Sequence, residues 1–198
     1  MLKNISYRLI ILLWLLSPVY ADAQLVGGNA FLKGNYIRLG LASNAAFGST
    51  VDAPPGFVLP GSDAKNTPLC NLGKIGFVAD AGKDGWNIGT PPYIGEYFLP
   101  GTPEEGWAVS MNGIDYNNNR SPEFIGANST DYCQSGTQIP GSFISFQDLP
   151  DKQVAEWEGI IDGLKIQKRI TLPKEKLYFI TEVKFINTTT SIIRDVYY

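Results

Sequence analysis

The sequence predicts an all-β protein, an antiparallel β-sandwich with long Gly/Pro-rich loops. Three observations support this fold class. Short apolar runs with period-2 alternation recur along the chain, and turn-forming residues separate them at close spacing. No stretch after the N-terminal leader has the periodicity of an amphipathic helix. The 198 residues include 21 Gly and 13 Pro, as expected when many strands are joined by irregular loops.

The first 23 residues have the three parts of a secretory signal peptide. Lys3 and Arg8 provide the positive start, residues 9–16 form an apolar core, and the small residues around Asp22 precede the cleavage point. The apolar run is too short to span a bilayer comfortably. We therefore expect a secreted or cell-surface protein whose mature chain begins at Gln24, with no membrane span after cleavage.

Residues 24–198 have a length that suits one domain. A competing prediction places a sub-boundary near Pro150, between a loop-rich first part and a strand-rich second part. The precursor carries 16 Lys and Arg against 19 Asp and Glu, a net charge of −3. This balance gives no basic surface for nucleic acid, so we expect no nucleic-acid partner.

The first half of the chain contains three predicted strands. Residues 35–42 (NYIRLGLA) alternate as a half-buried strand does, and residues 75–79 form a short apolar run between turn formers. Residues 107–113 alternate again and end at Asn112-Gly113, a pair that tolerates positive φ in a turn. Residues 115–139 are polar and turn-rich, and we expect them to form a long excursion.

The last sixty residues show the clearest strand pattern. Residues 141–149 predict one strand, and residues 154–161 and 164–172 predict a hairpin around Asp162-Gly163. On the second arm the apolar residues share one face with a single exception, Lys168.

Two further strands are predicted downstream. Residues 177–186 are apolar on both faces, which favours a central, covered strand, and residues 192–198 begin another strand. The chain stops in mid-strand at Tyr198, so we expect it to be the front portion of a longer protein, with its last strand incomplete.

The chain contains no histidine. Its own residues therefore cannot supply a Ser-His-Asp or Cys-His nucleophile, a histidine base or most zinc sites. Close carboxylate pairs occur only at Glu104-Glu105 and at Glu156 and Glu158, and the second pair fits a solvated strand face. We predict no catalytic residues, no cofactor and no metal.

Residues 115–119 (Asp115 to Asn119, DYNNN) resemble the first half of a calcium loop. Arg120 stands where an EF-hand needs Gly, and Gly126 stands where it needs Glu. An Asx-rich turn explains the pattern equally well.

Residues 76–107 are unusually aromatic, and two interpretations are open. Trp86, Tyr93, Tyr97 and Trp107 could form an exposed surface that stacks on sugar rings or anchors a protein partner. Alternatively, Trp86 and Trp107, each preceded by an acidic residue and Gly, restart strands and cap the core.

Two long segments carry a resemblance to a known group of proteins. LGKIGFVADAGKDGWNIGTPPYIGEYFLPGTPEEGW and WEGIIDGLKIQKRITLPKEKLYFITEVKFINTTTSIIRDVYY resemble the N-terminal region of large secreted surface proteins of Bacteroidota. The resemblance covers most of residues 29–198. It implies a β-sandwich of unassigned activity and a gliding-motility-type route through type IX secretion, whose C-terminal sorting domain is absent here.

These observations favour a non-enzymatic, secreted or cell-surface β-sandwich module with an adhesion or structural role, whose partner is a glycan or a surface or matrix protein. The alternative is a carbohydrate-binding module that leads into a downstream enzyme.

Cys70 and Cys133 are the only cysteines, and export to an oxidising compartment favours a disulfide between them. Closing a loop of about 60 residues would stabilise the fold by roughly 4 kcal/mol in the chain-entropy model. Intact-mass measurement after alkylation without reductant should show no free thiol. Two alkylated cysteines in the exported protein would contradict the pairing.

Overall fold

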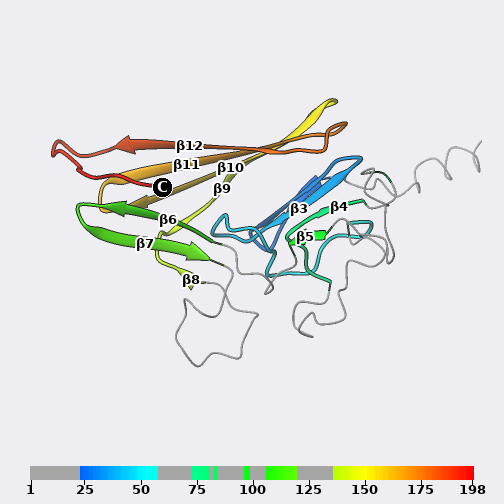
Figure 1. The fold of residues 1–198 in the computed structure, drawn as a ribbon, viewed down its shortest axis with the longest axis horizontal. Helices are drawn as coiled ribbons and strands as arrows, with labels where there is room; N and C mark the ends of the chain where they lie inside the picture. Colours follow the sequence, from blue (N-terminus) through cyan, green and yellow to red (C-terminus); the bar gives the residue numbers. More distant parts are fainter. Residues whose placement is uncertain (1–22, 58–72, 81–82, 84–95, 99–105, 120–135) are drawn as a thin grey trace, which may run out of the picture.

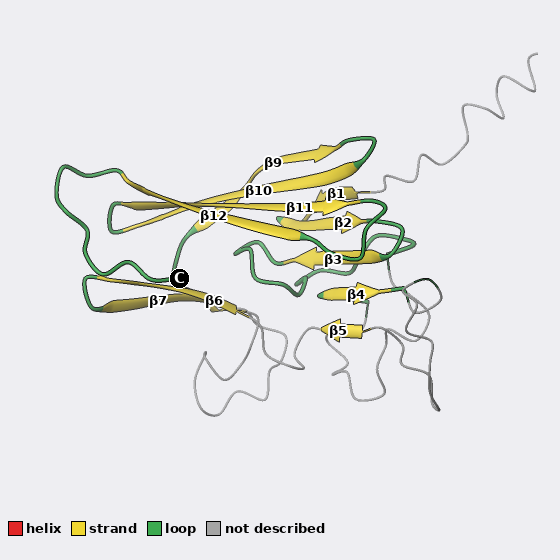
Figure 2. Cartoon of the chain, turned by 45° about the horizontal axis from the view of Figure 1, so that its top comes forward, coloured by secondary structure: helices red, strands yellow, loops and turns green. Residues whose placement is uncertain are grey.

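The computed structural model describes residues 23–57, 73–80, 83, 96–98, 106–119 and 136–198. Every regular element within these residues is a β-strand, and the strands form three antiparallel sheets (Figure 2). The protein is thus an all-β sandwich, as the sequence predicts. Among the described residues, no helix has the length and apolar character needed to cross a membrane.

The first sheet has five strands, paired in chain order by antiparallel ladders. Gly27 and Gly28, both with positive φ, make the turn between its first two strands. The strands are β1 (Ala23–Val26), β2 (Asn29–Lys33), β3 (Ile37–Leu41), β4 (Phe77–Ala79) and β5 (Glu96–Phe98).

The second sheet has four long strands in the order β12-β11-β10-β9. Asp162 and Gly163 join β10 to β11 with φ of 43° and 80°, which confirms the hairpin predicted from this dipeptide. The strands are β9 (Gly141–Asp148), β10 (Lys152–Ile161), β11 (Leu164–Pro173) and β12 (Ile180–Asn187).

The third sheet has three strands in the order β6-β7-β8. Asn112 and Gly113, with φ of 52° and 77°, form the predicted turn between its first two strands. Its strands are β6 (Gly106–Met111), β7 (Ile114–Asn119) and β8 (Gly136–Thr137).

The three sheets make two layers. The β9–β12 sheet is one layer, and the β1–β5 and β6–β8 sheets lie against different halves of its inner face (Figure 1). On β11, Ile170 and Leu172 pack against the β1–β5 sheet, while Leu164 and Ile166 pack against β6. The two hydrophobic cores therefore meet near the middle of β11, at Lys168.

The strand predicted over residues 35–42 is more buried than its alternation suggested. All five residues of β3 are buried, because its second face is also covered. Gly40 lies so close to Ile75 that a Cβ atom would overlap it, and the Gly40 amide donates to the Gly76 carbonyl at 2.7 Å.

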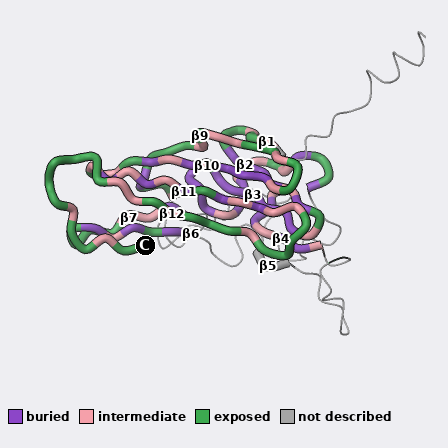
Figure 3. The backbone as a smooth tube through the Cα atoms, turned by 90° about the horizontal axis from the view of Figure 1, so that it is seen from above, coloured by how far each residue is buried: buried purple, intermediate pink, exposed green. Residues whose placement is uncertain are grey.

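The prediction that residues 177–186 form a central, covered strand is wrong. β12 lies at the edge of its sheet, and most of its residues are exposed (Figure 3). Only Val183 and Phe185 turn toward the core. An apolar run shows only that a segment is hydrophobic. Whether the strand has one neighbour or two depends on how it pairs in the tertiary structure.

Two further expectations need correction. Residues 115–119 are not part of an irregular excursion, since they lie in β7 and pair with β6. Residues 192–198 do not form a regular strand, although Tyr197 makes a two-bond bridge to Ser110 of β6. The terminal residues nevertheless lie beside the third sheet, where Tyr198 stacks near Trp107 and Phe185.

Gly159 and Gly141 face each other across β10 and β9 and leave room for the indole of Trp157. A Cβ atom on Gly159 would overlap that buried ring. Gly159→Ala should therefore lower the free energy of unfolding by about 1–3 kcal/mol or more, measured by chemical denaturation. Ser142→Ala, on the exposed side of β9, should change it little. Equal stability of the two variants would contradict this packing.

Candidate functional site

Residues 43–46, here called the seam loop, lie where the two hydrophobic cores meet. The loop follows β3 and turns tightly, with the Ala45 amide donating to the Ala42 carbonyl at 2.9 Å. Ala45 has a positive φ of 61°, an unusual conformation for a residue with a side chain. Ser43, although not itself buried, is followed by Asn44, Ala45 and Ala46, which are all buried.

Three successive carbonyl groups of the seam loop accept hydrogen bonds from side chains of the two other sheets. Trp157 Nε1 donates to Ser43 O at 2.9 Å. Trp107 Nε1 donates to Asn44 O at 3.0 Å, and Lys168 Nζ donates to Ala45 O at 3.0 Å. The loop thus ties the β9–β12 sheet and the β6–β8 sheet to the end of β3.

Lys168 is the charged residue at this junction, and it is only 4% exposed. Its ammonium lies 4.4 Å from the ring centroid of Trp107 and 5.9 Å from that of Tyr198. Trp107 in turn packs edge-on against Trp157, with ring centroids 5.3 Å apart. A carbonyl oxygen and aromatic faces together compensate a buried cation for lost hydration. Lys168, the one charged residue on the apolar face of β11, therefore has a structural role.

Asparagine side chains complete the junction. Asn44 Nδ2 donates to Gly136 O at 2.9 Å and to Asn119 O at 3.2 Å, which joins the seam loop to β7 and β8. Asn118 is fully buried, and its Nδ2 donates to Asn44 O and Ile139 O. Its Oδ1 accepts from the amides of Gln138 and Ile139. All four hydrogen-bonding positions of this amide are therefore used.

The same geometry argues against a calcium loop at Asp115–Asn119. In a strand these residues spread over about 13 Å, whereas ligands of one ion must converge within a few ångströms. Asn118 and Asn119 also bond to protein groups instead. Among the described residues, no group of three or more Asp, Glu, Cys or His side chains is arranged to hold a metal ion.

Glu156 and Glu158 lie on the outward face of β10, as predicted, with the buried Trp157 on the other face. Glu158 forms an ion pair with Lys165 at 2.9 Å and accepts a hydrogen bond from Gln167 at 2.9 Å. These two contacts, that of Lys165 above all, lower the pKa of Glu158 below its usual range. A general acid needs the opposite shift.

A shallow groove of about 370 Å³ runs along this outward face. Its side chains belong to β9, β10, β11 and β12, and they include Glu156, Gln167, Arg169 and Glu182. Glu156 and Arg169 are 3.7 Å apart. The groove is a charged strand face without an aromatic platform among its lining side chains, apart from Trp157, whose ring is turned into the core.

Of the four aromatic residues considered as ligand contacts, the structure locates the ring of Trp107 alone. Trp107 is 7% exposed and packs in the core, which favours the interpretation as a core residue. Tyr97 lies in β5, but its side chain is outside the described part of the structure. Trp86 and Tyr93, together with Cys70, Cys133, Glu104 and Glu105, also lie outside the described residues.

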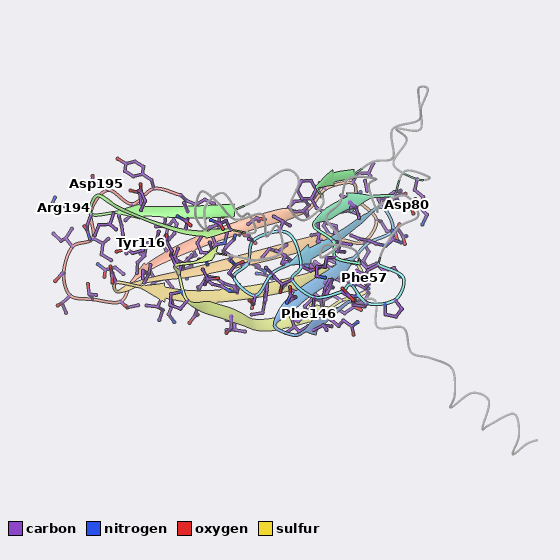
Figure 4. All side chains as sticks on the ribbon, turned by 90° about the horizontal axis from the view of Figure 1, so that it is seen from below. Phe57, Asp80, Tyr116, Phe146, Arg194 and Asp195 are labelled. Atoms are coloured by element: carbon purple, nitrogen blue, oxygen red, sulfur yellow. The ribbon has the colours of Figure 1, made fainter. Side chains whose placement is uncertain are left out.

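Tyr116 marks the far end of the same sandwich, near Arg194 and Asp195 (Figure 4). Its hydroxyl donates to a carboxylate oxygen of Asp162 in the β10–β11 turn. This hydrogen bond raises the pKa of Tyr116 above its usual value. It links the second and third sheets at the surface, as the seam loop does in the core.

Comparisons of this chain with protein-family models, with curated proteins and with solved structures find no match. The residues themselves must therefore carry the functional argument. Lys168 and Trp107 stand out in the sequence, and Asn118 lies in the segment that resembles a calcium loop, although its structural role differs from that prediction. Asn44 gave no such signal, because a single amide in a segment of small residues is also common in turns.

The buried amide of Asn118 gives a direct test of the junction. Asn118→Ala would leave several buried backbone groups without partners, each costing about 1–3 kcal/mol. We expect a loss of at least about 3 kcal/mol in the free energy of unfolding. Asp115→Ala is the control on the same strand, because the side chain of Asp115 is exposed and its loss should cost less than about 1 kcal/mol. Similar losses in both variants would contradict the role of Asn118.

Proposed function

We propose that this protein is a non-enzymatic, secreted or cell-surface β-sandwich module with an adhesion or structural role. The observation that carries the proposal is that buried polar side chains of the described residues bond to the protein's own backbone. Four of these side chains donate hydrogen bonds that hold the three sheets together, namely those of Trp107, Asn118, Trp157 and Lys168. Their partners are backbone groups of the protein, and their side chains are enclosed in the core.

The outward-facing carboxylates support the same proposal. Glu156 and Glu158 are each matched with a cation on β11, and the lowered pKa of Glu158 keeps it ionised. Two carboxyl groups side by side on a strand, each beside a cation, fit a solvated face. Glycoside hydrolysis needs one protonated and one ionised carboxyl group facing each other across a cleft.

The secretory leader and the resemblance to Bacteroidota surface proteins support export to the cell surface and a partner such as a glycan or a matrix protein. A module of this kind gains from a rigid core, because a rigid scaffold presents loops or strand edges without ordering cost on binding. The carbohydrate-binding alternative no longer has Trp107 as an exposed contact.

The proposal is tested with the protein recovered after export from a secreting host. Beads coated with it should be retained on matrix-protein or polysaccharide surfaces more than beads coated with an unrelated β-sandwich. The same preparation should show no turnover on glycoside, peptide and ester substrates. Turnover that disappears in Glu156→Gln or Glu158→Gln but persists in Lys176→Gln, an exposed control, would overturn the non-enzymatic assignment.

A further inference from the structure

β12 is the long, regular edge strand of the described structure. Its eight residues pair with β11 without a register shift. The opposite edge of the same sheet, β9, has a bulge, and the edge of β6 is already bonded to Tyr197. The remaining described edges, β1, β5 and β8, have two to four residues. A regular exposed edge offers backbone groups to another strand.

The outward side chains of β12 are arranged symmetrically about Val183. In sequence order they are Ile180, Glu182, Lys184 and Ile186. If a second β12 pairs antiparallel with Val183 opposite Val183, Glu182 faces Lys184 of the other copy, and Lys184 faces Glu182. Ile180 then faces Ile186 in the same way. Each outward position thus meets a residue of matching character, which a two-fold interface requires.

The charges on the neighbouring strands make this pattern informative. Glu156 pairs with Arg169, and Glu158 pairs with Lys165, so these two carboxylates of β10 have cationic partners on β11. Within the part of the chain that the structure describes, Glu182 and Lys184 form no ion pair, although Glu182 lies opposite Arg169 in the β11–β12 ladder, where Arg169 contacts Glu156. Ile180, which precedes them, is 45% exposed. The edge strand therefore carries both charges and apolar surface that a second copy would match.

We propose that β12 is a self-association edge, at which two copies of this chain pair through antiparallel β12 strands centred on Val183. The pairing joins the two β9–β12 sheets into one continuous sheet and leaves the seam loop untouched. It does not depend on the proposed adhesive role. The competing interpretation is that Glu182 and Lys184 guard the edge against pairing, as charged residues do on many edge strands.

Sedimentation equilibrium of the exported protein at low salt measures this association. Wild type should dimerise, while Glu182→Lys and Lys184→Glu should each weaken dimerisation by roughly tenfold or more, because each puts like charges opposite at two symmetric positions. The double variant Glu182→Lys with Lys184→Glu restores both opposite-charge pairs and the wild-type net charge. It should return the dissociation constant to within about threefold of wild type.

Lys176→Glu in the β11–β12 turn is the control for net charge, since it makes the same change as Lys184→Glu on an exposed residue outside the strand. It should leave dimerisation unchanged, and all variants should keep the wild-type thermal midpoint when it is measured at a concentration where the wild type is monomeric. A wild-type protein that stays monomeric up to millimolar concentration would overturn the proposal. So would a dimer that tolerates both single variants, or a double variant that is weaker than either.

Discussion

The architecture depends on satisfying the carbonyl groups of the seam loop, whose residues Asn44, Ala45 and Ala46 are buried. β3 ends inside the molecule, so the chain must turn there, and a turn exposes backbone groups that no sheet ladder can pair. Ser43, Asn44 and Ala45 each direct a carbonyl toward a side-chain donor of another sheet. Without those donors the loop would pay a desolvation cost for every unpaired group.

This constraint explains why two hydrophobic cores form one sandwich. The β1–β5 and β6–β8 sheets do not continue each other, and apolar contact alone would let them slide along the long β9–β12 sheet. Directional bonds from Trp157 and Lys168 to the seam loop set the position of the first sheet. Bonds from Trp107, and from Asn44 to β8, set the position of the third. The polar junction thus fixes how the first and third sheets are oriented on the β9–β12 sheet, while the cores bury most of the apolar surface.

The functional consequence is a rigid centre with charged outer surfaces. Trp107, which the sequence offered as a ligand contact, and Lys168, the exception in the apolar face of β11, are enclosed in the junction. What remains accessible on the β9–β12 sheet is a ladder of charges that ends at the open edge of β12. The proposed adhesive role and the proposed self-association therefore both rest on strand faces and edges.

The sequence by itself determined the features that depend on neighbouring residues. Period-2 alternation and the dipeptides Asn112-Gly113 and Asp162-Gly163 were enough to predict the β class, the β10–β11 hairpin, the turn that ends β6 and the inward face of β11, because side-chain direction and positive φ are local properties. Tertiary structure alone decided that β12 is an edge and that β7 is a strand. It also decided that Asn44 and Asn118 are buried partners of the seam loop. These outcomes depend on which distant segments meet, and alternation along one strand carries no information about the strand beside it.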